Sequence, residues 1–469
     1  MAGPFDRPPA SDFFTSPIGA VPKKGTDEYR RIHDLSHPHG ASLNDAIVEH
    51  RLRYVNFDAA AKMATTLGRG ALLAKLDVKT AFRCVAVHPS DRKWLGLVWR
   101  DKYYADLALP FGMRSSPALW EQYATFAEWI VRRAGVRHVC HYVDDFLVGG
   151  PAASDECAAA IALIVRTFGE LGIPINREKL IAEGTPATIV RFLGILIDTV
   201  RQIARLDDER VAALRSDLKA WSDRDACTRS ELESLIGTLA FAAKVVPAGR
   251  TFLRRMIDLL PKADRRSHHI KLNATFRADL HWWRTFVIDG DWNGVSLLLD
   301  PEWTQPPSVS ITDDPCPDFI FTDASGAGFG AVFGRQWLHG TWSARDLSDS
   351  TRDEIVSSAY VEMRAVAIAL ATWGPSCRGR RITIRSDSLV AVQTFTRKSA
   401  HHPALMHMIR TILFLAASHQ FAIRLRHIDG VANVYADMLS RGQIQAFRNS
   451  QSTFDRSPTA PQPLPPHIW

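Results

Sequence analysis

Residues 138–150 read HVCHYVDDFLVGG, two apolar runs that flank the acidic pair Asp144-Asp145. This pattern predicts a strand, a tight turn and a second strand. The run ALLAKLDV at 71–78 predicts another buried strand, with Asp77 near its end. If these strands are neighbours in one sheet, Asp77 and Asp144 converge on one point. Because adjacent carboxylates repel and Mg²⁺ prefers hard oxygen ligands, the three aspartates predict a metal site. The alternative, usual for an isolated Asp-Asp pair, is a solvated turn.

Four further acids stand at predicted strand ends and in predicted helices: Asp323, Glu362, Asp387 and Asp437. Asp323 ends the run FIFTD and Asp387 ends the run RITIRSD, which both read as strands. Glu362 lies within a predicted helix and Asp437 begins a later one. Four carboxylates in such places can hold two Mg²⁺ ions that direct water at a phosphodiester. The sequence therefore predicts a second metal site.

The apolar pattern divides the chain into three parts. Strands and helices alternate up to about residue 200, and both AFRCVAVHP (81–89) and KWLGLVWR (93–100) read as strands. From Leu206 to about Gly294 the pattern is helical. A proline- and acid-rich stretch at 300–317 then reads as a linker, after which strands and helices return. The prediction is an α/β multidomain chain.

Composition excludes several classes of protein. The 469 residues are 46% hydrophobic and 23% charged, which excludes a wholly disordered chain, a collagen and a coiled coil. No apolar run approaches the roughly 20 residues that span a bilayer, and Met1 to Pro9 lack the apolar core of a secretory signal. The net charge of +7 permits a polyanionic partner without requiring one. Six cysteines without a C-x-x-C pair indicate reduced thiols in an intracellular protein.

Five sequence blocks follow one another in the order and at roughly the spacing of reverse transcriptases. They are VPKKGTDEYRRIHDLS (21–36), LDVKTAF (76–82), LPFGMRSSP (109–117), YVDD (142–145) and FLG (192–194). The chain resembles this family over about residues 10–445. The chain most resembles DIRS-type, tyrosine-recombinase retrotransposons in three stretches, SPIGAVPKK, HDLSHPHGASLND and IGTLAFAAKVVPAGRTFLRRM.

The C-terminal part resembles RNase H in its motifs TDAS, EMRA, SDS and HIDGVANVYADMLSR. Together the two resemblances imply a right-hand polymerase, with fingers, palm and helical thumb, followed by an RNase H-like α/β domain. The implied boundaries are fingers and palm at 1–200, helical thumb and connection at 201–300, a linker at 301–317, RNase H at 318–445 and a disordered, proline-rich tail at 446–469.

By the resemblance to reverse transcriptases, Asp77, Asp144 and Asp145 are the catalytic carboxylates and metal ligands, and Val78 joins the metal ligands. Phe82 is implied to be the steric gate, whose ring would clash with the 2′-hydroxyl of a ribonucleotide. The alternative for Phe82 is a core aromatic.

The other substrate contacts implied for the polymerase lie on both sides of this block. Lys23 or Lys24, together with Arg30, would contact the incoming triphosphate, because anions need fixed cations; the alternative is a solvated basic hairpin. Phe111-Gly112 stands where retroviral enzymes carry Gln-Gly, so a polar side chain is missing from the nucleotide pocket.

Two further segments are implied to hold the primer and the duplex. Phe192-Leu193-Gly194 would be the primer grip, with a core strand as the alternative. Arg250, Arg254 and Arg255 on the thumb would contact phosphates, with a solvated helix face as the alternative.

The RNase H resemblance assigns the remaining functional residues. Asp323, Glu362, Asp387 and Asp437 become catalytic metal ligands. His427 precedes Asp437 by ten residues, which suits a histidine that helps proton transfer, although it fits equally well as the structural end of a strand. Asn433 would contact the RNA strand, with a helix cap as the alternative.

We therefore expect an RNA- and DNA-directed DNA polymerase with RNase H activity. The expected cofactor is Mg²⁺, two ions per active site, with Mn²⁺ as the alternative. The expected partners are an RNA template, a DNA primer, the RNA–DNA hybrid, dNTPs and other proteins of the retrotransposon, without a membrane. The expected location is intracellular, in the cytoplasm, the nucleus or both. Two alternatives stay open: a nuclease whose fingers are incomplete, and a non-catalytic nucleic-acid binder.

Overall fold

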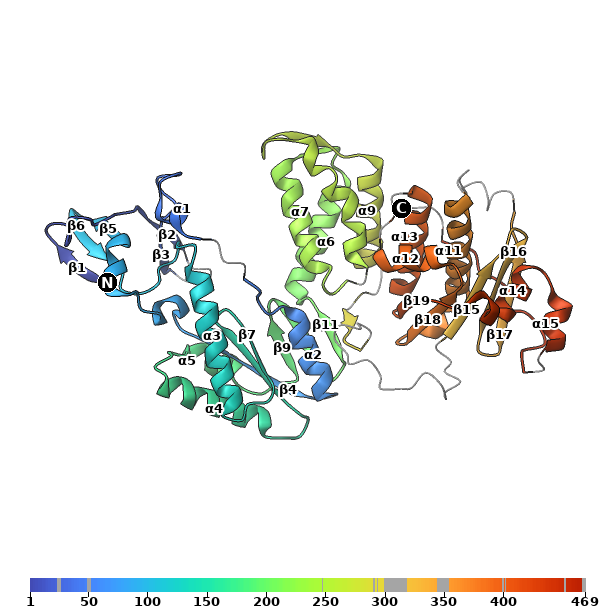
Figure 1. The fold of residues 1–469 in the computed structure, drawn as a ribbon, viewed down its shortest axis with the longest axis horizontal. Coiled ribbons are helices and arrows are strands. Elements are labelled where there is room, and N and C mark those ends of the chain that lie inside the picture. The colour runs from blue at the N-terminus through green and yellow to red at the C-terminus, as the bar shows by residue number, and fades with distance from the viewer. Residues whose placement is uncertain are drawn as a thin grey trace. The chain divides into compact units, whose positions relative to one another are not determined.

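A computed structural model describes residues 1–22, 27–48, 52–246, 248–289, 292, 294–298, 319–343, 354–398, 400, 402–450 and 453–465. The chain forms two compact units, Met1–Gln202 and Ile203–Trp469 (Figure 1). The expected linker at 301–317 lies outside the described residues. Within the described part, no helix has the length and apolar character needed to cross a membrane.

The first unit contains seventeen helices and strands in its described residues. They are β1 (Ala2–Phe5), β2 (Ile18–Pro22), β3 (Tyr29–His33), α1 (Leu43–Ala46), α2 (Phe57–Leu67), β4 (Leu72–Asp77), the 3₁₀ helices η1 (Ala81–Cys84) and η2 (Pro89–Trp94), β5 (Gly96–Trp99), β6 (Lys102–Ala105), α3 (Ser116–Arg133), β7 (Val139–Tyr142), β8 (Asp145–Gly150), α4 (Glu156–Glu170), α5 (Arg177–Glu183), β9 (Ile189–Phe192) and β10 (Ile195–Asp198).

The centre of this unit is an antiparallel sheet with the strand order β4-β8-β7. Side chains alternate between the two faces of a strand, so Ala74 and Leu76 of β4 point into one core with α3 and α4. Asp77 lies on the other face of β4, where α5 packs. This alternation positions a carboxylate at the end of an apolar strand without placing it inside the main core.

The stretch 81–89 differs from the strand expected there. Thr80 has a left-handed backbone with φ of 56°, and Ala81–Cys84 turn as a 3₁₀ helix instead of extending from β4. Hydrophobic residues at 81, 82, 85 and 87 still face the interior, so their pattern alone does not distinguish a turn from a strand. The strand expected at 93–100 is present only as Gly96–Trp99.

The N-terminal strands of the first unit are held by a buried carboxylate. β2 and β3 pair as a hairpin, and β1, β6 and β5 form a separate sheet. Asp106, which follows β6, is fully buried, accepts a hydrogen bond from Arg31 at 2.8 Å and forms an ion pair with Arg83 at 2.9 Å. Burial opposes the charged form of Asp106, but the His33 ring, with Nδ1 3.8 Å away, and the two arginine charges outweigh it and lower its pKa. This cluster ties β3 to the segment after Phe82.

The second unit begins with a mainly helical segment. Its elements are β11 (Ile203–Arg205), α6 (Asp208–Ser222), β12 (Ala226–Thr228), α7 (Arg229–Ala242), η3 (Gly249–Phe252), α8 (Arg254–Ile257), η4 (Leu260–Lys262), β13 (His269–Lys271), α9 (Ala274–Arg284), the π-helical turn η5 (Thr285–Asp289) and β14 (Val295–Ser296). Thr228 and Glu231, which stand three residues apart in the sequence pattern T-x-x-E, form a capping box at the start of α7. The expectation of an entirely helical segment over 206–294 was wrong, because β12 pairs with β13 within it.

The rest of the second unit is a five-stranded sheet with helices on both faces. Its elements are β15 (Phe319–Ala324), β16 (Gly328–Phe333), β17 (Gln336–Thr341), α11 (Glu354–Trp373), η6 (Gly374–Cys377), β18 (Arg381–Ser386), α12 (Leu389–Arg397), α13 (Pro403–Ser418), β19 (Ala422–His427), η7 (Gly430–Ala432), α14 (Val434–Ser440) and α15 (Ile444–Ser450). The strand order is β17-β16-β15-β18-β19, and β15, β18 and β19 run parallel. Helices α11 and α13 share one apolar core with the sheet, whereas α14 and α15 cover the other face.

A buried ion pair joins the helical segment to this sheet domain. Arg410 of α13 and Asp279 of α9 are 1% and 0% exposed, and Nη1 of the arginine lies 2.7 Å from a carboxylate oxygen. The Arg410 guanidinium also lies over the ring of Phe252. Because both charges are buried, each depends on the other for compensation.

The C-terminal tail differs from the disordered end expected at 446–469. Residues up to Ser450 continue as α15, and part of 453–465 packs against β17. The indole N–H of Trp337 donates to the carbonyl of Asp455 at 2.7 Å, and the Thr459 amide donates to the Trp337 carbonyl at 2.8 Å. Prolines prevent a regular strand here, but they do not prevent these edge contacts.

Candidate active sites

The first cluster of carboxylates forms where β4 and β8 end. Asp77 pairs directly with Asp145 across the antiparallel ladder, and Asp144 lies in the turn between β7 and β8. The Val78 amide donates to the Asp144 carbonyl at 2.9 Å, which ties that turn to the end of β4. The three aspartates are thus brought together by strand register, as expected if the two apolar runs form neighbouring strands.

Burial opposes charge on these aspartates. It raises the pKa of Asp144, and the nearby charge of Asp77 raises it further. Burial also raises the pKa of Asp145 to about 6, against the opposing charge of Lys75. Because several buried carboxylates share one region, a divalent cation there would stabilise their ionised forms.

Asp77 already has a cationic partner. Nζ of Lys179, on α5, lies 2.7 Å from one carboxylate oxygen, and the amide of Asn176 approaches the other at 3.4 Å. Burial opposes the charged form of Lys179, but the hydrogen bond and the charge of Asp77 outweigh it and raise its pKa. Sequence reasoning missed Lys179, whose only signal was its place in the basic run INREKL. The Lys179 ammonium lies where a metal ion bound to Asp77 would also lie, so the two cations would compete for this carboxylate.

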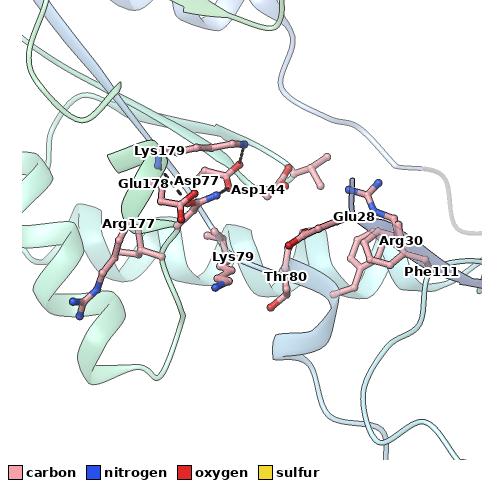
Figure 2. A pocket seen from close by; sticks show the side chains of 16 residues that line it. Glu28, Arg30, Asp77, Lys79, Thr80, Phe111, Asp144, Arg177, Glu178 and Lys179 are labelled. Atoms are coloured by element: carbon pink, nitrogen blue, oxygen red, sulfur yellow. Dashed lines mark hydrogen bonds and ion pairs between the residues drawn. The ribbon is translucent and has the colours of Figure 1, made fainter. Parts of the chain in front are cut away.

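A cavity of about 830 Å³ opens beside this cluster. Figure 2 shows Asp77, Asp144 and Lys179 at one end of it, with Arg30 and Phe111 at the other. Its lining includes four cationic side chains, from Arg30, Lys79, Arg177 and Lys179. A cavity with carboxylates at one end and several cations in its wall suits an anionic ligand that is bound together with metal ions.

Two aromatic rings form part of the cavity wall. Phe82 and Phe111 have ring centroids 5.0 Å apart, and the Arg30 guanidinium lies 4.6 Å from the Phe111 centroid. Gly112 has φ of 109°, and a β-carbon there would lie 1.9 Å from the His33 carbonyl oxygen, so this position requires glycine. The structure therefore groups Arg30, Phe82 and Phe111, whereas Lys23 and Lys24 lie outside the described residues.

The second cluster lies in the sheet domain of the second unit. Asp323 stands near the end of β15, Glu362 on α11 and Asp387 directly after β18. Ligand oxygens of these three residues all lie within 4.8 Å of one another. Within the described residues, this trio is the one group of at least three His, Cys, Asp or Glu side chains that meets this distance. The aspartates of the first cluster are more widely spread.

Glu362 has a pKa that is raised further than that of Asp323. Burial, followed by the charges of Asp323 and Asp387, raises the pKa of Glu362 to about 8. Burial raises the pKa of Asp323 to about 6, and Asp387 and Asp437 add to this effect against a hydrogen bond from Ser440. A group of acids that are hard to ionise together fits a site that binds divalent metal.

The other predicted residues of this cluster lie around the trio. Asp437 forms an ion pair with Arg441, and Nε of the arginine lies 2.7 Å from the Asp437 carboxylate. His427 is exposed at the end of β19, and its Nε2 lies 3.1 Å from the Asp387 carbonyl oxygen. Asn433 is 2% exposed and donates to the Thr322 carbonyl at 2.9 Å, which fits a structural role better than direct contact with a ligand.

Comparisons with known proteins agree with this division of the chain. Residues 21–197 match the family model described as reverse transcriptase (RNA-dependent DNA polymerase). Residues 21–197 form a reverse transcriptase domain. The match contains all three aspartates of the first cluster and the cavity beside them.

Polyproteins of retroelements are similar to a larger part of the chain. Polyprotein P3 of Commelina yellow mottle virus is 21% identical over 80% of this chain, and the Transposon Tf2-3 polyprotein of Schizosaccharomyces pombe is 23% identical over 79%. The matched regions make up 18% and 25% of those two proteins, so the chain spans about a quarter of their length or less.

A solved structure shows the same fold. The foamy viral protease-reverse transcriptase dRH in complex with double-stranded DNA has a TM-score of 0.50 and 16% sequence identity. The match covers 88% of this chain and 65% of that one. The predicted fold class, an α/β right-hand polymerase followed by an RNase H-like domain, is confirmed.

One predicted substrate contact of the reverse transcriptase domain lies away from solvent. Phe192 is 1% exposed on β9, while Leu193 and Gly194 form the turn to β10 with φ of 49° and 80°. The Phe192 ring is therefore a core residue, whereas Leu193 and Gly194 are partly exposed. Arg255, which was predicted to contact phosphates, instead has Nη1 3.6 Å from the Asp279 carboxylate.

Proposed function

We propose that the chain is an RNA- and DNA-directed DNA polymerase that also hydrolyses RNA in RNA–DNA hybrids. The observation that carries this proposal is the pairing of Asp77 with Asp145, beside Asp144 and a cation-lined cavity, inside a reverse transcriptase domain. The trio in the RNase H-like domain supports the second activity.

The first cluster would hold two Mg²⁺ ions through Asp77, Asp144 and Asp145, with the Val78 backbone completing the ligand set. The metal would activate the primer 3′-hydroxyl and stabilise the leaving pyrophosphate. The Lys179 ammonium, now 2.7 Å from Asp77, would have to move aside as Asp77 takes up its ligand role. Mn²⁺ is the alternative metal, since oxygen ligands suit both ions.

The cavity wall would bind the incoming dNTP. Arg30, with Lys23 or Lys24, would bind the triphosphate, and Phe82 would exclude a ribose 2′-hydroxyl. Phe111 holds Arg30 in place through the contact between its ring and the guanidinium. Gly112 keeps the backbone close to His33, so that this wall retains its shape.

The second cluster would hold two Mg²⁺ ions through Asp323, Glu362 and Asp387, with Asp437 completing the set. The metal would direct water at a phosphodiester of the RNA strand. The exposed His427 ring is free to turn from the Asp387 carbonyl toward substrate, so we keep its role in proton transfer. We assign Asn433 to positioning β15 rather than to RNA contact, on its bond to Thr322.

We also propose the source and setting of the chain. The amino-acid sequences of its motifs support an origin in a DIRS-type retrotransposon. The partners would be an RNA template, a DNA primer and other proteins of that element. The enzyme would act inside the cell, in the cytoplasm, the nucleus or both. Fingers and palm would extend over 1–200, thumb and connection over 201–300, a linker over 301–317 and RNase H over 318–445.

The test is one reaction that reports both activities. A labelled DNA primer on a differently labelled RNA template is incubated with dNTPs and Mg²⁺, using wild type, D145N and D387N. We expect wild type to extend the primer and cut the RNA, D145N to lose extension only, and D387N to lose cutting only. Cutting without extension by wild type would reduce the function to a nuclease, and binding without either activity would leave a nucleic-acid binder.

A further inference from the structure

The turn that carries Asp144 has an unusual backbone. β7 ends at Tyr142 and β8 begins at Asp145, so Val143 and Asp144 form a two-residue loop. Val143 has φ of 54°. Two-residue hairpin loops with positive φ usually carry glycine, asparagine or aspartate there. A β-branched residue in this region is strained and persists only where the surrounding structure enforces it.

A tryptophan on α3 supplies such a constraint. Nε1 of Trp120 donates to the carbonyl oxygen of Val143 at 2.8 Å. The Trp120 side chain is 1% exposed and belongs to the core beneath the sheet, so its position is fixed by packing. A buried donor of this kind gives up a hydrogen bond to water, and the Val143 carbonyl replaces that bond.

The loop is therefore held from two sides. Trp120 binds the carbonyl of Val143, and the Val78 amide binds the carbonyl of Asp144 at 2.9 Å. Val78 directly follows Asp77, so this second bond fixes the loop relative to the other carboxylate-bearing strand. With both loop carbonyls held, the direction in which the Asp144 side chain leaves the backbone is fixed as well.

We propose that Trp120 is a positioning residue of the polymerase centre. Its indole N–H holds Val143 in the left-handed conformation and thereby places the carboxylates of Asp144 and Asp145 for metal binding. The inference rests on the proposed polymerase function, because it assigns Trp120 a part in that site. It differs from a packing role, which would need the ring but not the N–H group.

The variant W120F separates these two roles, because phenylalanine keeps an aromatic ring but has no donor. We expect the kcat for primer extension to fall about tenfold, as a carboxylate misplaced by a fraction of an ångström costs of that order. The KM for dNTP should stay within about twofold, and the Mg²⁺ concentration for half-maximal rate should rise. Cutting of RNA in the hybrid should be unchanged. The matched control is W129F, on the exposed side of the same helix.

A second variant tests the strain directly. V143G removes the β-branched side chain, and glycine adopts positive φ without strain. If Trp120 acts by holding Val143, W120F should cost less than about twofold in kcat in the V143G background, because the turn no longer needs to be held. Equal costs of W120F in both backgrounds would overturn the proposal and leave Trp120 as a packing residue.

Hydrogen exchange tests the inference without enzymatic activity. Backbone amides of 142–147 should exchange about tenfold faster in W120F than in wild type, while the rest of the first unit is unchanged. Unchanged exchange at the turn, or faster exchange throughout the unit, would overturn the proposal. If wild type extends no primer, the proposed function fails, but this comparison still decides whether Trp120 holds the turn.

Discussion

Replacing Glu362 with glutamine should stabilise the metal-free protein at alkaline pH while abolishing metal binding by the second cluster, around Asp323, Glu362 and Asp387. Glu362 is 5% exposed, and its pKa of about 8 results from burial, then from the charges of Asp323 and Asp387. Its carboxylate accepts hydrogen bonds from the Ala324 amide and the Ser386 hydroxyl, both at 3.2 Å. Glutamine keeps the shape of the side chain but cannot ionise.

The direction of the pH effect follows from linkage. The folded protein holds the Glu362 proton more tightly than the unfolded chain, where the pKa lies near 4.5. The resulting stability is fully present below pH 4.5 and is lost as the pH rises through 8. A gap of about three and a half pH units corresponds to at most about 5 kcal/mol, and relaxation of the site upon ionisation lowers this figure. A gain of a few kcal/mol should raise the Tm by roughly 5–10 °C.

The assay is calorimetric unfolding in EDTA at pH 5.5, 7 and 8.5. Wild type should lose stability relative to E362Q across this range, whereas the exposed control E209Q should follow wild type. Metal binding gives a second readout at pH 7, which lies below the Glu362 pKa of about 8, so that this side chain carries a proton that must leave when metal binds. Titration of wild type with Mn²⁺ in buffers of different ionisation enthalpy should report that release, which E362Q should lack.

Identical pH dependence of the Tm in wild type and E362Q would refute the reasoning. It would show that Glu362 ionises in the folded protein as easily as it does in water. A stabilised E362Q that still binds metal with wild-type affinity would keep the electrostatic account but remove Glu362 from the ligand set.

Three further predictions concern other parts of the chain. R410M should destabilise the second unit by about 3–5 kcal/mol in urea unfolding, because it leaves Asp279 buried without its main partner. The double variant R410M/D279L should recover most of this loss. Equal losses of unfolding free energy in R410M and R410M/D279L would contradict the account. F82A should raise ribonucleotide incorporation relative to dNTP incorporation at least about tenfold in primer extension, and an unchanged ratio would make Phe82 a core residue. T228A should cost about 1 kcal/mol in unfolding free energy through loss of the α7 cap, whereas an exposed change such as S230A should cost little.

The parts of the fold that depend on local patterns could be predicted from sequence. The apolar runs around Asp77 and Asp144 predict the strands, and the register of β4 and β8 brings the aspartates together. The capping box at Thr228 gives the start of α7 to the residue. In both cases the residues that predict a strand or a helix start lie within that element or next to it.

Features that depend on distant contacts could not be predicted in this way. Lys179 pairs with Asp77 from 102 positions away, and Arg410 pairs with Asp279 from 131. No local pattern marks either partner. The tail was expected to be disordered because prolines suppress regular structure, yet Trp337 gives Asp455 a hydrogen-bonding partner that its own sequence does not reveal.

The central claim is that this chain contains two separate metal centres. It is tested most directly by replacing Mg²⁺ with Fe²⁺ and mapping where hydroxyl radicals, generated with ascorbate, cut the polypeptide. The protein should be bound to a hybrid with a dideoxy-terminated primer and the next dNTP. We predict cuts near Asp77 and Asp144 that D145N abolishes, and cuts near Asp323, Glu362 and Asp387 that D387N abolishes, each without effect on the other. Cuts at only one cluster, or loss of both sets in a single variant, would contradict two independent centres.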